Sequence, residues 1–255
     1  MNTALASQNF KNRYGFTIHP NSAKFENWAS NQVFSLTTLF PTVQKSKIHH
    51  IDLSTTSEFI GGIEEFNDLD FFQKKLEKLQ KEVPTKIITG GYLEKRALYT
   101  SDIYKRESEN GLEKRNVHLG LDFWLPENTP VHAFLDGEVV CVTDDAHHKG
   151  YGGLLILKHR VADFHFYTLY GHNTVKSVKK HFIGSKVKKG TQIAVLANAA
   201  ENGGWVPHLH FEIMLTRLDY TNDFPGVTFE SELAIWKRIC PDPNLLFKLD
   251  GFKKS

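Results

Sequence analysis

The chain has 255 residues, of which 40% are hydrophobic and 24% are charged, and its formal net charge is +2. This composition is that of an ordinary soluble globular protein with room for one good core and a small second unit. The near-neutral charge and the lack of a long basic run or a basic-aromatic patch argue against nucleic acid as a partner.

Neither a membrane span nor a signal peptide is predicted. The chain contains no run of 18 apolar residues, and its N-terminus lacks a basic start followed by an apolar run. The chain as written is therefore expected to be cytoplasmic, or periplasmic or secreted if a leader has been removed. Only two cysteines are present, and Cys141 is expected to be a buried small hydrophobe rather than the disulfide partner of Cys240.

Residues 1–90 are predicted to form a small N-terminal α+β region of unknown role. Residues 47–53 have the pattern of a short strand. Polar capping residues at 67–70 precede apolar residues at helical spacing, which predicts an amphipathic helix that Pro84 ends. The region contains no motif of catalytic specificity.

Residues 91–220 are predicted to form a β domain, because short apolar strands alternate with glycine turns. Its core is expected to be antiparallel and barrel-like or sandwich-like. Residues 221–255 are predicted to be a short helical C-terminal appendage that packs on this core, with Pro241 and Pro243 ending its helix. The predicted fold class is therefore mainly β. No oligomeric state follows from the sequence.

Two distant stretches, residues 117–123 and 207–213, alternate apolar and polar residues. Each is expected to be a half-buried strand that points histidines and a carboxylate to one face. In the second stretch, His208 and His210 would lie about 6.6 Å apart at Cα. That separation suits one metal ligand with a catalytic neighbour better than two ligands of one ion.

His118, Asp122 and His210 supply the two nitrogens and one carboxylate that suit a zinc site with an open position for water. On a straight strand, His118 and Asp122 would be about 13 Å apart. A shared ion therefore requires the chain to bend between them. Gly120 lies at the midpoint, where it permits a bend and adds no side chain that would block the ion.

Three ordered motifs in this chain resemble those of the lysostaphin-type zinc endopeptidases. They are HxxxD at residues 118–122, Leu-Tyr-Gly-His at residues 169–172 and HxH at residues 208–210. The resemblance runs from about residue 115 to residue 213. It implies the duplicated hybrid-motif β fold of that family and a peptide or peptidoglycan-type substrate.

The resemblance also implies the roles of five side chains. His118, Asp122 and His210 would bind one zinc ion per chain, and His172 and His208 would be unligated catalytic histidines. The chemistry agrees with these roles. The chain has no HExxH motif whose glutamate could act as the general base. A neutral imidazole can do so instead, because it accepts or donates a proton near pH 7. Which histidine is the base and which stabilises the oxyanion stays open.

The function expected from these motifs is that of a zinc-dependent metalloendopeptidase that cleaves peptide or peptidoglycan cross-link amide bonds. Two alternatives remain. One is a non-catalytic zinc-binding or regulatory module of the same fold, and the other is a phosphocarrier-like histidine protein. Asp122 argues against the carrier, because a carboxylate would repel a phosphoryl group while it suits a zinc ion.

Four further side chains have open roles. Glu212 is expected to be an exposed strand residue, with orientation of a metal ligand as the alternative. Arg96 and Arg115 are expected to form surface ion pairs, with binding of a substrate carboxylate or phosphate as the alternative. Trp205 could pack on the sheet or stack against a substrate at the mouth of a cleft.

Overall fold

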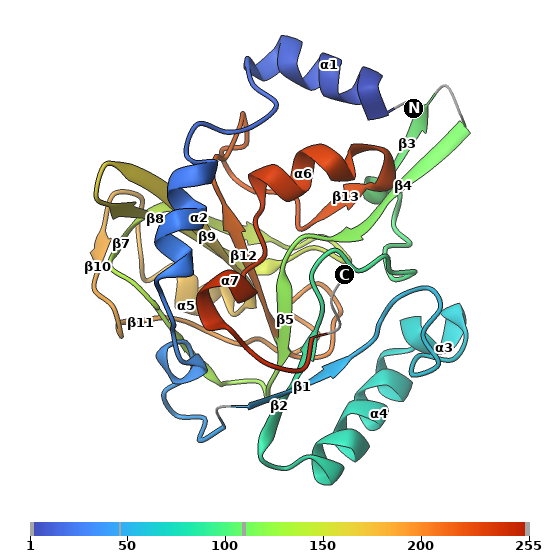
Figure 1. Cartoon of the computed structure of the whole chain (residues 1–255). Helices are drawn as coiled ribbons and strands as arrows, with labels where there is room; N and C mark the ends of the chain where they lie inside the picture. Colours follow the sequence, from blue (N-terminus) through green and yellow to red (C-terminus); the bar gives the residue numbers. More distant parts are fainter. Residues whose placement is uncertain (1–2, 46, 109–110, 253–255) are drawn as a thin grey trace.

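The structure is a computed structural model that describes residues 3–45, 47–108 and 111–252. Three short 3-10 helices lie at Leu36–Thr38, Asp102–Tyr104 and Glu230–Glu232. The other elements, most of them labelled in Figure 1, are α1 (Thr3–Tyr14), α2 (Ser22–Ser30), β1 (Lys47–Ile51), α3 (Ile63–Asn67), α4 (Leu69–Glu82), β2 (Lys86–Gly90), β3 (Lys105–Ser108), β4 (Gly111–His118), β5 (Leu121–Trp124), β6 (Pro130–His132), β7 (Gly137–Asp145), β8 (Gly152–Val161), β9 (Phe164–Asn173), α5 (Val175–Val178), β10 (Lys186–Val187), β11 (Gln192–Val195), β12 (His208–Met214), β13 (Val227–Phe229), α6 (Leu233–Ile239) and α7 (Asn244–Phe247).

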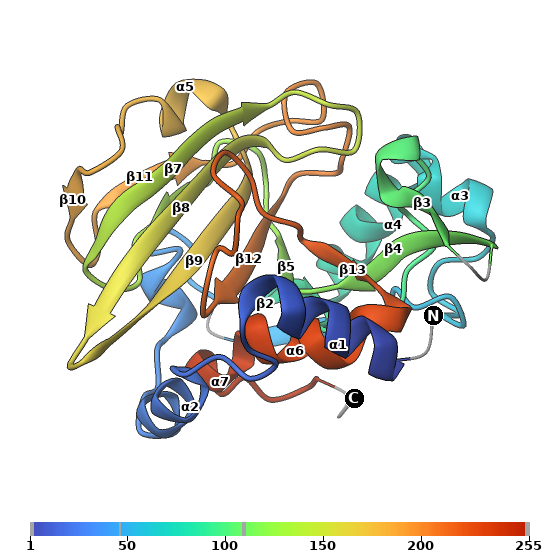
Figure 2. The ribbon, with the colours of Figure 1, turned by 90° about the horizontal axis from the view of Figure 1, so that it is seen from above.

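An eight-stranded sheet forms the centre of the fold (Figure 2). Its strand order is β1-β2-β5-β12-β9-β8-β7-β10, and only the β1/β2 pair is parallel. The prediction of a mainly β fold is confirmed. The barrel form of that prediction is not, because β1 and β10 lie at opposite edges of the sheet and the described strands do not close on themselves.

Alternation along β12 divides its side chains between two faces, as the sequence predicted. Leu209, Phe211 and Ile213 belong to the main core, where Phe211 packs against Phe134 and Phe247 at ring distances of 5.9 and 5.6 Å. Burial of such a side chain contributes about 1.5 to 3 kcal/mol. Every residue of β12 is buried, so its polar face is covered as well.

The first 90 residues extend the sheet past β5. The predicted strand is present as β1, and it pairs with β2, which in turn pairs with β5. The predicted amphipathic helix is present as α4, where the Asp68 side chain accepts a hydrogen bond from the Phe71 amide and so caps the first turn. Phe72 packs on Trp124 of β5 at 6.1 Å. The division of the chain at residues 90 and 220 stays a prediction, and residues 1–2 and 253–255 of the outer regions lie outside the described ones.

The predicted bend lies between β4, which ends at His118, and β5, which begins at Leu121. A Cβ atom on Gly120 would lie 2.7 Å from the Phe211 carbonyl oxygen and 2.8 Å from the His210 ring. The turn therefore needs glycine because β12 passes so close to it.

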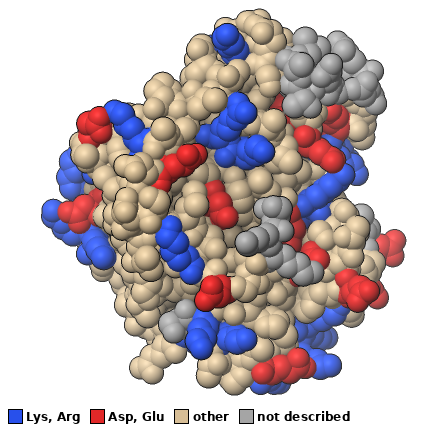
Figure 3. Space-filling model, in the orientation of Figure 1, with Lys and Arg blue, Asp and Glu red and all other residues tan. Residues whose placement is uncertain are grey.

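Charged side chains of both signs are interspersed on the face that Figure 3 shows, which agrees with the small net charge. None of the helices in the described part of the chain combines the length and apolar character that a membrane crossing requires.

Candidate active site

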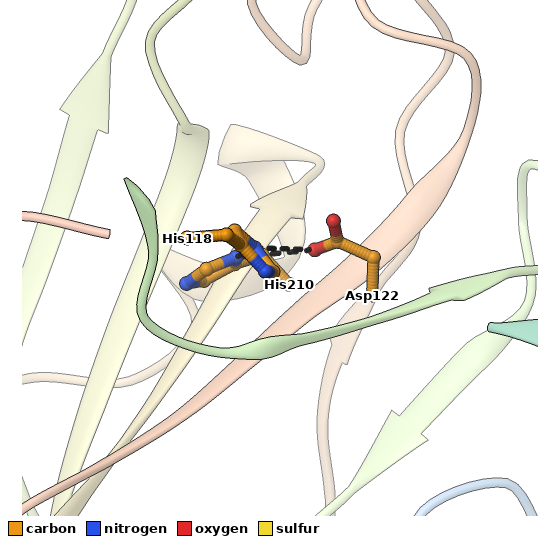
Figure 4. Close-up of side chains that lie close together, drawn as sticks. All are labelled: His118, Asp122 and His210. Carbon is orange, nitrogen blue, oxygen red and sulfur yellow. Dashed lines mark hydrogen bonds and ion pairs between the residues drawn. The ribbon is translucent and has the colours of Figure 1, made fainter. Parts of the chain in front are cut away.

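His118, Asp122 and His210 meet in a buried cluster (Figure 4). The β5/β12 register sets His210 opposite Asp122, and the bend after β4 returns His118 to the same point. His118 Nε2 lies 2.9 Å from His210 Nδ1, and Asp122 Oδ1 lies 3.2 and 3.1 Å from these two nitrogens. The structure thus brings together the three residues that the sequence proposed as metal ligands.

The outer nitrogens of the two imidazoles are already hydrogen-bonded. His118 Nδ1 lies 2.8 Å from the Gly91 carbonyl oxygen, and His210 Nε2 lies 3.3 Å from Glu212 Oε2. Both partners are acceptors, so in each neutral ring the proton sits on the outer nitrogen and the inner nitrogen has a lone pair. Two nitrogen lone pairs and a carboxylate oxygen therefore face one another without a proton to share.

A metal ion fits this arrangement. Tetrahedral zinc with ligand bonds of 2.0 to 2.1 Å separates neighbouring ligand atoms by about 3.3 Å, close to the distances in the cluster. Without an ion, hydrogen bonds to Asp122 and Glu212 outweigh the effect of burial and raise the pKa of His210 to about 9. In the metal-free protein, a proton on His210 therefore supplies positive charge that a metal ion would otherwise supply.

Arg96 binds the oxygen of Asp122 that is not shared with the two histidines. Its Nη1 donates to Asp122 Oδ2 at 2.6 Å, and its Nε donates to Glu94 Oε2 at 2.7 Å. Glu94 in turn accepts a hydrogen bond from the Leu53 amide at 2.8 Å. The expectation of a surface ion pair is wrong for Arg96, which is only 3% exposed, because β2 and the segment after it cover this side of the site. The arrangement occupies one oxygen of Asp122 and leaves Oδ1 for the cluster.

Glu212 is fully buried, so the prediction of an exposed strand residue is also wrong. The polar face of β12 is covered by the C-terminal part of the chain, where Gly226 lies against the His210 ring and the Cys240 thiol lies close to Glu212. Glu212 is therefore in place to fix the tautomer of His210, the alternative that the sequence left open. Cys141 and Cys240 are both buried free thiols, as expected.

His172 and His208 lie beside the cluster, with ring centroids 4.2 Å apart. The Nδ1 atoms of His172 and His208 lie 3.0 and 2.7 Å from the carbonyl oxygens of Asn202 and Val206. Both Nε2 atoms are thereby left as proton acceptors in the neutral rings. Burial lowers the pKa of both histidines, so they are uncharged at neutral pH.

A cavity of about 280 Å³ opens onto these five residues. Trp205 forms part of its wall, with its ring 6.0 Å from that of His172, and its indole N–H donates to the Gly150 carbonyl at 3.1 Å. Tyr99, Lys149 and Tyr151 are among the lining residues to which the sequence analysis gave no role. Only Tyr151 had a local signal, since it stands in the glycine-rich segment at residues 150–153.

A mainly β domain with two buried histidines and an aspartate at the floor of an open cavity is typical of a metalloenzyme. Residues 116–222 match peptidase family M23. This match confirms the resemblance of this part of the chain to the lysostaphin-type peptidases.

Two curated relatives are each similar to a part of this chain. An uncharacterized metalloprotease of Haemophilus influenzae is 38% identical over 95 residues, which are 37% of this chain and 18% of that protein. The peptidoglycan DD-endopeptidase ShyA of Vibrio cholerae is 34% identical over 98 residues, which are 38% of this chain and 20% of that protein. The chain thus spans about a fifth of the length of either relative. The catalytic domain of lysostaphin from Staphylococcus simulans is 25% identical, with a TM-score of 0.31, and the match covers 48% of this chain and 80% of that one.

Proposed function

We propose that this protein is a zinc-dependent metalloendopeptidase that cleaves peptide bonds or the amide bonds of peptidoglycan cross-links. The observation that carries the proposal is the set of three lone-pair atoms at 2.9 to 3.2 Å, with the outer nitrogen of each histidine already bonded to an acceptor. Two histidines and one carboxylate leave a fourth position free for water, as catalytic zinc sites do.

A zinc ion at this cluster would lower the pKa of a water molecule and polarise the scissile carbonyl. His172 and His208 supply the proton transfers. One neutral imidazole takes a proton at Nε2 from the attacking water, and the proton then passes to the leaving amine. The negative charge that develops on the oxyanion raises the proton affinity of the other imidazole, which would then take up a proton from solvent and donate it in a hydrogen bond to the oxyanion. Arg96 and Glu212 act through the ligand residues Asp122 and His210, so they are positioning residues in this scheme.

The substrate and compartment are part of the same proposal. The Vibrio cholerae relative is named a peptidoglycan DD-endopeptidase, which supports a peptidoglycan-type substrate here. Such a substrate would require a periplasmic or secreted location.

The test begins with the purified chain, treated with chelator and then reconstituted separately with zinc and with magnesium. Elemental analysis should find about one zinc per chain. The zinc form, but not the magnesium form, should cleave cross-linked muropeptides or tetraglycine peptides, with products identified by mass spectrometry. Stoichiometric zinc without cleavage of either substrate would favour the non-catalytic module, and failure to bind zinc would refute the proposal.

A further inference from the structure

Lys149 is a buried cation in the wall of the active-site cavity. It is 7% exposed, and its Nζ lies 4.0 Å from the ring centroid of Trp205. None of the described carboxylates lies within ion-pair distance of the Lys149 ammonium. Among the described residues, the ammonium makes a cation–π contact with the face of the Trp205 indole. Burial lowers the pKa of Lys149 to about 8, so the ammonium form still predominates at neutral pH.

The backbone around Lys149 is held firmly. Its N–H donates to the Gly203 carbonyl at 2.7 Å, and its own carbonyl accepts a hydrogen bond from the Tyr104 hydroxyl. Its φ of 67° lies in the left-handed region, which residues other than glycine rarely adopt. A lysine fixed in this way over an aromatic face keeps its charge in one place, whereas a lysine on a mobile surface loop would not.

Lys149 is also close to the residues proposed for chemistry. Trp205 lies between them, with its ring centroid 6.0 Å from that of His172 and 6.5 Å from that of His208. Together with the distance from Nζ to Trp205, these values place the ammonium within about 10 Å of the His172 ring, a span that an extended peptide covers in about three residues.

The two arginines that line the cavity have other partners. Arg96 is engaged by Asp122 and Glu94. Arg115 donates to the Ile103 carbonyl at 2.7 Å, and its charge acts on Asp223, where burial nevertheless raises the pKa of the carboxyl. Lys149 is therefore the cavity cation whose charge is left for a ligand.

We propose that Lys149 and Trp205 form a substrate subsite for a carboxylate. The preferred substrate would then be a peptide with a free carboxylate within about three residues of the scissile amide. The ammonium would pair with that carboxylate in a partly desolvated site, where a charged hydrogen bond is worth more than it is in water. This inference rests on the proposed function and specifies its substrate class.

The test compares each substrate with its uncharged form. Cross-linked muropeptides would be assayed before and after conversion of their carboxylates to carboxamides, and tetraglycine would be compared with tetraglycine amide. With the zinc-loaded protein, kcat/KM should be at least about tenfold higher for the carboxylate form. In Lys149→Met, which keeps an apolar side chain over Trp205, the ratio should fall to about one, whereas Lys149→Arg should retain most of the preference.

Lys180→Met is the matched control, because it removes one positive charge from an exposed position outside the cavity. It should keep the ratio of the wild-type protein. The subsite would be overturned if the wild-type protein cleaved the carboxylate and carboxamide substrates equally. It would also be overturned if Lys149→Met kept the preference for the carboxylate substrate, or if Lys149→Met lost activity on both substrates to the same extent. Cleavage of neither form by the wild-type protein would instead count against the proposed peptidase function.

Discussion

Replacement of Arg96 by methionine tests the idea that the metal cluster depends on a partner behind it. The guanidinium donates at 2.6 Å to Asp122 and at 2.7 Å to Glu94, and all three side chains are almost wholly buried. The variant keeps much of the packing volume but leaves two carboxylates without their cation. Loss of one partner of a buried ion pair costs about 3 to 5 kcal/mol, a large part of the 5 to 15 kcal/mol that is typical of a whole domain.

The effect on the metal should be separate from the effect on folding. Residues that orient metal ligands typically contribute about 10- to 100-fold to metal affinity, so we expect Arg96→Met to weaken zinc binding by that factor. Competition with a chelator of known affinity measures the zinc dissociation constant, and urea unfolding of the metal-free protein measures the free energy of unfolding.

Two further variants sharpen this experiment. The double variant Arg96→Met/Glu94→Gln removes one of the orphaned charges, so it should recover part of the lost stability without recovering zinc affinity. Arg115→Met removes another cavity arginine that touches none of the ligands, and it should leave zinc binding unchanged. The reasoning would be refuted if Arg96→Met bound zinc within twofold of the wild-type protein, or if the double variant restored affinity along with stability.

Five other variants test the division of roles in the cluster and the turn that forms it. His118→Ala or Asp122→Ala should abolish both zinc retention and hydrolysis, as measured by elemental analysis and by product formation. His172→Ala or His208→Ala should abolish hydrolysis while zinc stays bound; equal loss of zinc in all four variants would contradict this division. Gly120→Ala places a Cβ atom 2.7 Å from a backbone carbonyl of β12. This variant should therefore lower the free energy of unfolding by about 1 to 3 kcal/mol and weaken zinc binding. A urea midpoint equal to that of the wild-type protein would show that the turn is not tightly packed.

Local patterns in the sequence predicted the elements that carry the site. The alternation through residues 208–214 and the glycine at position 120 define β12 and the bend before β5, because side-chain direction along a strand has a fixed period of two. The helix after Asp68 was equally predictable from its capping residue and apolar spacing. The helices α1 and α2 were not, and within α2 only Phe25 and Ala29 are buried.

The supporting residues of the cluster could not be predicted in the same way. Arg96 and Glu212 are charged residues whose local sequence is that of a surface strand or loop. The burial of Arg96 depends on its contact with Asp122 of β5, and that of Glu212 on residues 226–240, and these partners are distant in sequence. A pattern of period two states that Glu212 shares a face with His210, but it does not state what covers that face.

The charges of the buried residues in and around the cluster indicate which kind of ion it can bind. Three carboxylates with little exposed surface, those of Glu94, Asp122 and Glu212, lie in or next to the cluster, and Arg96 forms ion pairs with the first two. When all three carboxylates are ionised, Arg96 balances one of them and, without a metal ion, a proton on His210, whose pKa is raised to about 9, balances another, in a region where unpaired charge is costly. One divalent cation between His118, Asp122 and His210 neutralises the group, whereas a monovalent ion would leave it negative. The buried charges thus favour a divalent metal for a reason independent of the distances between the ligand atoms.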